Sequence, residues 1–353
     1  MVDISVSLLV PGSEAAYSDF LEKNSGALFY HSLKYRNFLK KILVDSNDLY
    51  FLAYQNAEIV GVLPTFIKKL ADQKSIINSL PFFGSHGGVL ISNSINCSTE
   101  VKKTLMDKLL NVVKQENTVS LTIIDNPTAI ESKFYENYTQ PSDQRISQIT
   151  DISISNKNNI EDDLMAKFHY KTRNMIRKGM KSGFAVEKQC SLDAFKELYG
   201  LHSENMKVIG GKEKPFFVFK AIYENFESTK DYNIYFAKKN DEVAAVLLVF
   251  YYKNYCEYFT PVINQKYRSE QPLSLLIFQA MQDAVKKGCD YWNWGGTWLT
   301  QDGVYLFKKR WGATSQIYHY FNQIFDREYL KHSGEEMISN SYFYIYPTSK
   351  INK

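Results

Sequence analysis

The sequence predicts an α/β protein made of two fused modules, each a mixed sheet flanked by helices. The first observation is an internal repeat: AYQNAEIVGVL at 53–63 and AKKNDEVAAVL at 237–247 share five residues when aligned without a gap. Each copy is typical of a strand, a short polar turn and a strand, and Asn favours such turns because it tolerates positive φ. The second observation is that an amphipathic helix precedes each hairpin, and a helix and then a strand follow it. The third is the length of the chain, because 353 residues are more than one domain with a single hydrophobic core usually contains. Five matches in eleven could arise by chance, but the shared order of elements makes duplication the better interpretation.

The first module is expected to span residues 1–155. Its expected elements are, in order, a strand at 3–9, helices near 14–22 and 32–43, the hairpin at about 49–69, two strands around the Gly-rich bend of INSLPFFGSHGGVLIS, a helix near 99–116, the strand TVSLTIID and a short helix after Pro127. Residues 138–160 are polar and rich in Asn, Ser, Asp and Gln, with the strand-like SQITDISIS inside, which marks the domain boundary.

The second module is expected to span residues 156–330. Its expected elements are a long helix over about 160–182 that ends at Gly183, two helices around the loop VIGGKEKP, the second hairpin, the strand CEYFTPV, a helix near 271–287 and the strand DYWNW. Residues 331–353 are expected to form a peripheral C-terminal tail.

Composition narrows the class of protein. Residues 1–150 carry 14 basic and 15 acidic side chains, whereas the remainder carries 28 and 23, so a phosphorylated partner should favour the second half. The cysteines have no metal-binding spacing, and we interpret them as reduced thiols of a cytoplasmic protein; they are Cys97, Cys190, Cys256 and Cys289. The N-terminus does not resemble a signal peptide, no stretch has the length to span a bilayer, and the scattered histidines indicate no metal site.

The most unusual segment is DYWNWGGTWLTQDGVYLFKKRWGA, residues 290–313. It predicts a strand that breaks at Gly295 and Gly296 and a short helix near 301–311. Such strand ends are where α/β folds place ligands, and exposed backbone N–H groups there can hold an oxyanion or a phosphate. The alternative is that the glycines form only a turn and that the tryptophans, Trp294 among them, belong only to the core.

This segment resembles the Fem family, which comprises the peptidoglycan-bridge aminoacyltransferases and related acyltransferases. The shared pattern is Gly-Gly after a strand, a short helix with Phe-Lys, then Trp-Gly-Ala and a strand, and the basic stretch KFHYKTRNMIRKGMKSGFAVE is similar to the start of that family's second module. The resemblance covers most of residues 30–325 in order and implies two fused modules of the GNAT acetyltransferase type.

The resemblance also implies an acyl-transfer centre. Phe307 and Lys308 would line it together with Gly295 and Gly296, and Trp294 would contribute to substrate binding. A lysine ammonium beside a reacting ester can stabilise the developing oxyanion, and such help is typically worth about 3–4 kcal/mol. The alternative for Lys308 is a solvated lysine on a basic helix face, since Lys309 and Arg310 follow it.

Two segments of the first module are candidates for acceptor binding. In FYHSLKYRNFLKK the resemblance implies that Tyr35 and Lys40 lie where the family contacts the diphosphate of a nucleotide-sugar acceptor. The family usually has Gln and Trp where this chain has His31 and Tyr35, so a changed acceptor is plausible. His86, in a Gly-rich loop similar to one that borders the family's acceptor cleft, has the pKa range of a general base, although a turn histidine without a role is more common.

The stretch 166–181 carries six basic side chains and no acid. Arg173, Arg177 and Lys181 are spaced four apart and share a helix face. This face is a candidate phosphate-binding surface, for tRNA or for a pyrophosphate acceptor, and the alternative is an ordinary solvated helix.

Coenzyme A is not supported by a motif. GNAT acetyltransferases hold its pyrophosphate with a glycine-containing turn at a helix start, whereas the matching place here reads YRSEQPLSLL. Pro272 has no N–H to offer, and Glu270 adds a negative charge. We therefore expect no cofactor.

The sequence as a whole favours a cytoplasmic, Fem-like transferase that moves an acyl or aminoacyl group onto an amine of a phosphorylated cell-envelope precursor. Aminoacyl-tRNA is the first candidate donor, DNA is not an expected partner, and peripheral contact with a membrane stays open. One alternative is an N-acyltransferase that uses acyl-CoA or an acyl carrier on an amino sugar in polysaccharide biosynthesis. Another is a non-catalytic nucleotide- or glycan-binding protein.

Overall fold

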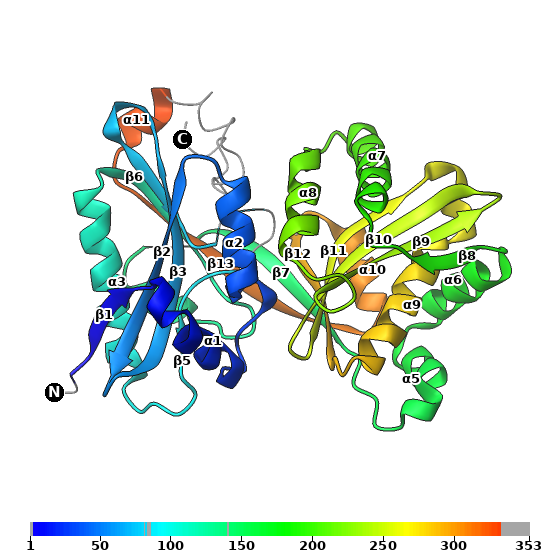
Figure 1. The fold of residues 1–353 in the computed structure, drawn as a ribbon, viewed down its shortest axis with the longest axis horizontal. Coiled ribbons are helices and arrows are strands. Elements are labelled where there is room, and N and C mark those ends of the chain that lie inside the picture. The colour runs from blue at the N-terminus through cyan, green and yellow to red at the C-terminus, as the bar shows by residue number, and fades with distance from the viewer. Residues whose placement is uncertain (1–2, 81, 83–85, 140, 333–353) are drawn as a thin grey trace. The chain divides into compact units, whose positions relative to one another are not determined.

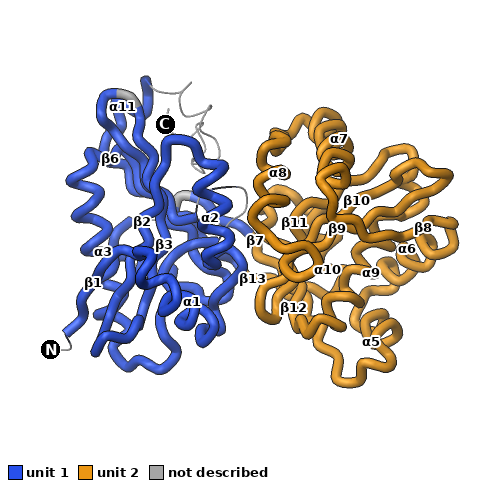
Figure 2. Tube along the Cα trace, viewed as in Figure 1, with its two compact units in different colours: residues 1–145, 317–353 blue, residues 146–316 orange. Residues whose placement is uncertain are grey.

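The computed structural model describes residues 3–80, 82, 86–139 and 141–332, and the chain forms two compact units (Figures 1 and 2). The first unit consists of residues 1–145 and 317–353, and the second of residues 146–316. The chain leaves the first unit within strand β7 (Pro141–Asp151) and returns to it within β13 (Ala313–Ile324).

These borders differ from the expected 155/156 and 330/331. The second half of β13 belongs to the first unit because Tyr320–Ile324 pair with β6. Helix α11 (Arg327–His332) follows, and the rest of the predicted tail, residues 333–353, lies outside the described residues.

The sheet of the first unit has the order β1-β2-β3-β4-β6-β13. Its strands are β1 (Ser5–Leu8), β2 (Ser46–Gln55), β3 (Glu58–Lys69), β4 (Ser75–Asn78), β6 (Thr118–Ile124) and β13, while β5 (Leu90–Ile91) pairs with β3. Successive side chains of a strand point to opposite faces of the sheet. Phe51 and Ala53 of β2 therefore join the core formed with helix α3 (Ser98–Gln115). Tyr50 lies on the other face and contacts Tyr17 of α1 (Glu14–Lys23). Helix α2 (Leu33–Ile42) packs on β2, and α4 (Ser132–Tyr135) follows β6.

The sheet of the second unit has the order β7-β12-β11-β10-β9-β8. Its other strands are β8 (Ala185–Lys188), β9 (Tyr232–Lys239), β10 (Glu242–Tyr252), β11 (Tyr255–Ile263) and β12 (Tyr291–Trp298). Three helices contribute to the core on one face of this sheet: α5 (Ile160–Lys167), α6 (Tyr170–Lys181) and α9 (Pro272–Lys286). Two further helices, α7 (Leu192–Ile209) and α8 (Phe216–Asn225), pack together, and α7 contacts β11 (Figure 1). Helix α10 (Asp302–Arg310) connects β12 to β13.

The two units repeat one order of elements, as the sequence predicts. The hairpin turns Asn56-Ala57 and Asn240-Asp241 both have two residues with positive φ. Hairpin β2–β3 is followed by β4, α3 and β6, and hairpin β9–β10 by β11, α9 and β12. The predicted α/β class with two related modules is therefore confirmed.

The predicted long helix over 160–182 is wrong, because the chain forms α5 and α6 with a break at Phe168 and His169. Phe168 is buried, with its ring centroid 5.1 Å from that of Trp311. The backbone N–H of His169 donates to the carbonyl oxygen of Arg310 at 2.9 Å instead of continuing a helix. A tertiary contact with the end of α10 thus interrupts a stretch whose sequence pattern is helical throughout.

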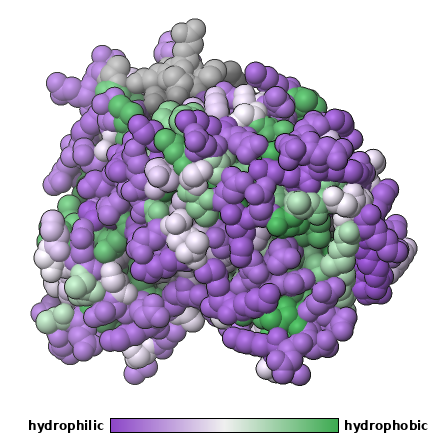
Figure 3. All heavy atoms as spheres, turned by 45° about the vertical axis from the view of Figure 1, so that its right-hand side comes forward, coloured by the Kyte–Doolittle hydropathy of each residue, from purple (hydrophilic) through white to green (hydrophobic). Residues whose placement is uncertain are grey.

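Hydrophilic side chains cover most of the face drawn in Figure 3, and hydrophobic residues form separate smaller areas among them. The large apolar side chains mostly lie in the cores of the two units. Among the helices of the described residues, none has the length and apolar character that a bilayer span requires.

Candidate functional site

The sheet of the second unit opens between β11 and β12. These parallel strands pair only where Tyr255–Glu257 face Tyr291–Asn293, although β11 continues to Ile263 and β12 to Trp298. The corresponding strands of the first unit, β4 and β6, stay joined beyond Asn78, because the Ser79 N–H donates to the Thr122 carbonyl oxygen and Ser79 Oγ accepts from the Ile124 N–H. Of these two related strand pairs, only that of the second unit separates along its length.

Buried polar side chains gather where the pairing ends. Glu257 and Asn293 form the last pair, Thr260 follows on β11, and all three are buried. Asn293 Oδ1 accepts the Gly295 N–H at 2.9 Å, whereas Asn293 Nδ2 and Thr260 Oγ1 have no hydrogen-bond partner within the described part of the chain. Buried polar groups are normally satisfied, so these two groups make this region a candidate place for an ordered water or a bound molecule. The analysis of the sequence did not identify these residues, and the signal it passed over is a Glu inside the apolar strand CEYFTPV.

Lys308 of α10 contacts the part of β12 that no longer pairs with β11. Its side chain is only 5% exposed, and its Nζ donates to Thr297 Oγ1 at 2.7 Å and to the carbonyl oxygens of Gly295 and Gly296 at 3.4 Å each. Burial lowers the pKa of Lys308 to about 8. The lysine is therefore not the solvated residue that the sequence left as an alternative.

The strand does not break at the glycine pair as predicted, because β12 runs through it to Trp298. Gly295 has φ +69, a conformation that side-chain-bearing residues rarely adopt. The bend turns the carbonyl oxygens of the pair toward Lys308, so the glycines contribute carbonyl acceptors here as well as N–H groups.

Phe307 and Trp294 form the apolar wall of this centre. Phe307 is half-buried, 5.9 Å from Trp294 and 6.2 Å from Trp311 between ring centroids. Trp294 is only 3% exposed, and its Nε1 donates to Thr150 Oγ1 at 2.9 Å. Trp294 thus belongs to the core, and a direct contact of its ring with substrate stays a prediction.

The basic helix α6 is anchored to the helix that carries Lys308. Thr172 Oγ1 donates to the carbonyl oxygen of Arg310 at 3.0 Å, and the start of α6 is bound to the same oxygen through His169. Arg177 and Lys181 are exposed, whereas Arg173 is half-buried and donates to the Phe168 carbonyl oxygen at 2.6 Å. Two of the three predicted cations are therefore accessible to a phosphate.

The analysis of the sequence did not identify a second lysine near the unpaired strand, Lys214, which is half-buried. Lys214, in the loop between α7 and α8, places its Nζ 5.3 Å from the ring centroid of Phe259, on the part of β11 that no longer pairs with β12. Burial lowers its pKa to about 8. Its backbone N–H donates to His202 Nε2 at 3.0 Å, which holds the loop in place. The signal was the loop VIGGKEKP, to which we assigned no role.

The remaining predicted site residues belong to the first unit. Tyr35 is buried, with its ring centroid 5.3 Å from that of Tyr30, and the buried His86 lies 5.1 Å from Tyr30 and 5.2 Å from Tyr318. Lys40 is exposed and pairs with Asp48 at 3.2 Å. The structure thus joins Tyr35 and His86 through one aromatic cluster and leaves Lys40 open to solvent.

The start of α9 weakens part of the argument against coenzyme A. Pro272 is the first residue of the helix, and Gln271 before it has φ +66. Glu270, however, pairs with Lys239 at 2.6 Å, so its negative charge is largely compensated. The missing N–H of Pro272 remains the stronger argument, and weak binding of coenzyme A stays a prediction.

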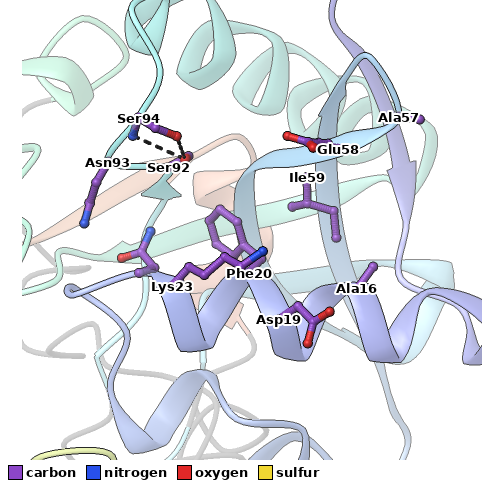
Figure 4. Close-up of a pocket in the computed structure, with 11 residues that line it drawn as sticks. Ala16, Asp19, Phe20, Lys23, Ala57, Glu58, Ile59, Ser92, Asn93 and Ser94 are labelled. Atoms are coloured by element: carbon purple, nitrogen blue, oxygen red, sulfur yellow. Dashed lines mark hydrogen bonds between the residues drawn. The ribbon is translucent and has the colours of Figure 1, made fainter.

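A cavity of about 380 Å³ lies in the first unit, between α1, the β2–β3 turn and residues 92–94 (Figure 4). Asp19, Lys23 and Glu58 line it, and none of the predicted site residues does. Across the described residues, no three side chains of His, Cys, Asp or Glu are grouped as a metal site would require.

Comparisons with known proteins point to one fold. The profile of the family described as "Acetyltransferase (GNAT) domain" matches residues 166–309. The crystal structure of FemX is similar over 93% of this chain and 99% of its own, with 14% identity and a TM-score of 0.72. A tandem GNAT protein from the clavulanic acid biosynthesis pathway is similar over 91% of this chain and 98% of its own, with 8% identity and a TM-score of 0.59.

The C-terminal domain of a putative lysylphosphatidylglycerol synthetase from Agrobacterium fabrum is also similar, over 93% of this chain and 96% of its own, with 10% identity and a TM-score of 0.55. No curated protein sequence matches the chain significantly. The chain therefore has the double GNAT fold found in FemX and in tandem GNAT proteins, and its second unit carries the part that matches the GNAT acetyltransferase domain family.

Proposed function

We propose that this protein is an N-acyltransferase that moves an acyl or aminoacyl group onto an amine of a cell-envelope precursor. The observation that carries the proposal is Lys308, a buried lysine held beside the opening between β11 and β12. Its position in the second unit agrees with the GNAT profile match, which ends at residue 309.

The reaction needs a neutral amine that attacks the carbonyl carbon of the donor. A C–N bond forms, the bond from the carbonyl carbon to the carrier's oxygen or sulfur breaks, and the carrier leaves with the bonding electrons and takes up a proton. Two contacts of Lys308 Nζ are long, at 3.4 Å, so one N–H can turn from a glycine carbonyl to the oxyanion of the tetrahedral intermediate. Glu257, a buried carboxyl at the end of the strand pairing, is the proposed acceptor of the amine's proton.

The acceptor is proposed to carry phosphate, linked to a nucleotide or a lipid. Arg177 and Lys181 offer exposed cations, and Lys214 offers a cation beside the unpaired part of β11. Lys40, an exposed cation of the first unit, is proposed as a separate phosphate contact. For a lipid-linked acceptor, the exposed Trp298 and Leu299 at the end of β12 suit peripheral contact with a membrane surface.

Aminoacyl-tRNA is the proposed donor, which places the protein in the cytoplasm, where aminoacyl-tRNA is made. One observation favours an acyl-CoA donor instead: the family that matches residues 166–309 is described as an acetyltransferase domain. The pairing of Glu270 with Lys239 removes one objection to that donor. Its acceptor would be an amino sugar in polysaccharide biosynthesis.

The test is a transfer assay with two donors, aminoacyl-tRNA and acetyl-CoA, and with nucleotide-linked, lipid-linked and amino-sugar acceptors. We expect Lys308→Ala to lower turnover roughly a hundredfold or more, as loss of an oxyanion donor does. Lys309→Ala is the matched control, because Lys309 is the exposed neighbour on the same helix. Equal activity of the wild type and Lys308→Ala would refute the assigned centre, and no transfer with any donor would favour a non-catalytic binding protein.

A further inference from the structure

One buried side chain connects the strand and the helix that form the Lys308 centre. Gln148 of β7 is completely buried, and both ends of its amide are used. Its Oε1 accepts a hydrogen bond from Thr297 Oγ1 of β12 at 3.0 Å, and its Nε2 donates to the carbonyl oxygen of Tyr305 in α10 at 3.0 Å. Gln148 therefore links β12 to α10 through one hydrogen bond to each.

The direction of each hydrogen bond in this network is determined by chemistry. A lysine ammonium can only donate, so Thr297 Oγ1 accepts from Lys308 Nζ at 2.7 Å. The single hydroxyl hydrogen of Thr297 is then available for Gln148 Oε1. The Tyr305 carbonyl oxygen can only accept, which fixes the Nε2 end of the amide toward α10. Thr297 and Gln148 thus each donate to one acceptor in this network, while Lys308 donates to Thr297 and to the two glycine carbonyl oxygens. The last acceptor, the Tyr305 carbonyl oxygen, lies one turn before Lys308 on its own helix.

The network is electrically neutral apart from Lys308 itself. In the second unit, the titratable groups of β7, β12 and α10 besides Lys308 are Asp151, Tyr291, Asp302, Tyr305, Lys309 and Arg310. None of these groups contributes to the lowered pKa of Lys308, whose cause is burial. The ammonium is held by oriented neutral dipoles, so an N–H can be released to a developing oxyanion without breaking an ion pair.

We propose that Gln148 is a positioning residue for the transfer reaction, because it holds the Thr297 hydroxyl with a lone pair toward Lys308 and so keeps the ammonium beside the part of β12 that no longer pairs with β11. This inference rests on the proposed role of Lys308 as the group that stabilises the oxyanion. Gln148 does not touch the reacting atoms and acts through Thr297.

The first measurement follows the titration of Lys308 directly and needs no substrate. The protein is labelled with [¹³Cε]lysine, the resonance of Lys308 is assigned by its loss in Lys308→Arg, and its chemical shift is followed over a series of pH values. Gln148→Glu keeps the shape of the side chain but places a carboxylate next to Thr297, and an opposite charge at such range favours the charged form of lysine. We expect the pKa of Lys308 to rise by about one unit or more in this variant.

The second measurement is kinetic. Gln148→Leu removes both hydrogen bonds of the amide, and we expect kcat to fall about tenfold or more with little change in KM, since misplacement of a transition-state donor affects the chemical step. Thr297→Val should give a similar loss, and the double variant should lose no more than either single variant, because both changes break the same connection. Thr150→Val, which removes two buried hydrogen bonds two residues further along β7, is the control for a merely structural effect.

The outcomes separate this inference from the proposed function. If folded Gln148→Glu and Gln148→Leu leave both the Lys308 titration and kcat as in the wild type, Gln148 is not a positioning residue. If their kcat falls only as far as that of Thr150→Val and the titration is unchanged, the role is structural and the inference is also wrong. If Gln148→Glu shifts the Lys308 titration but Lys308→Ala keeps full turnover, the connection is real and the proposed function of Lys308 fails.

Discussion

Glu257 and Asn293 lie opposite each other as the last residue pair of the parallel ladder between β11 and β12. Both side chains are buried, and beyond them the two strands no longer pair. A carboxylate and an amide are thus placed together at the edge of an opening in an otherwise continuous sheet. A core strand pair would hold apolar side chains there, so this pair indicates a site for polar chemistry.

Glu257→Gln should lower kcat roughly a hundredfold, because general base catalysis contributes at least about that factor. The substitution keeps the size of the side chain and removes only its ability to take a proton. Steady-state transfer assays with the donor that the two-donor assay supports measure the effect. Glu187→Gln, on the edge strand β8, is the control and should keep wild-type turnover. Wild-type kcat in Glu257→Gln would exclude this residue as the base.

The stability of the protein should depend on pH through Lys308. The pKa of this lysine is lowered in the folded protein to about 8 from its ordinary 10.5, so between these values the unfolded chain binds a proton that the folded protein does not. The free energy of unfolding therefore gains a contribution as pH rises through this window, and the cost of the buried charge is fully present below pH 8. Relative to Lys308→Met, the wild type should gain roughly 1.4 kcal/mol for each unit of the shift.

Urea denaturation of the wild type, Lys308→Met and the control Lys309→Met at pH 8 and at pH 10 measures this difference. A constant difference in the free energy of unfolding between the wild type and Lys308→Met at the two pH values would contradict the lowered pKa of Lys308.

Lys214 should bind an anionic group of the acceptor. Its ammonium lies over Phe259 on the unpaired part of β11, and burial lowers its pKa to about 8. Lys214→Met should raise KM for the acceptor about tenfold while kcat changes less, since the lost contact is made in the ground state as well. Lys212→Met, an exposed change in the same loop, should behave as the wild type. An unchanged KM in Lys214→Met would remove Lys214 from the site.

Binding of a phosphorylated acceptor should weaken as salt is added, because exposed phosphate contacts are screened. Arg177→Ala and Lys40→Ala should each weaken binding severalfold and reduce its dependence on salt. Titration calorimetry with nucleotide sugars at two ionic strengths provides the measurement. Lys220→Ala, an exposed lysine on α8, is the control. Binding that neither substitution affects would contradict the phosphate surface on α6 and at Lys40.

Coenzyme A should bind weakly or not at all. Pro272 begins α9 and has no N–H, so one of the backbone donors that a pyrophosphate needs at a helix start is missing. Because Glu270 is paired with Lys239, the prediction depends on this missing donor rather than on charge repulsion. Calorimetry with acetyl-CoA is decisive, since micromolar affinity would make acyl-CoA the first candidate donor.

The sequence alone determined the features that depend on local pattern. The repeated hairpins were predictable because strand periodicity and turn residues such as Asn56 and Asn240 are local signals, and the structure gives both turns positive φ. The glycine pair, Phe307 and Lys308 were identifiable because their order along the chain is itself the signal. The class of fold followed from these elements and their repetition.

Only the tertiary structure decided how these groups work together. The break between α5 and α6 depends on the contact of Phe168 with Trp311, which lies far away in the sequence. The end of the β11–β12 ladder at Glu257 and Asn293 is a matter of strand register, which no local pattern encodes. The lowered pKa of Lys308 and its hydrogen bonds to Thr297 and, through it, to Gln148 arise from burial among residues of three separate elements. Burial and long-range pairing are properties of the folded chain, and for that reason the sequence could name the lysine but could not give its environment.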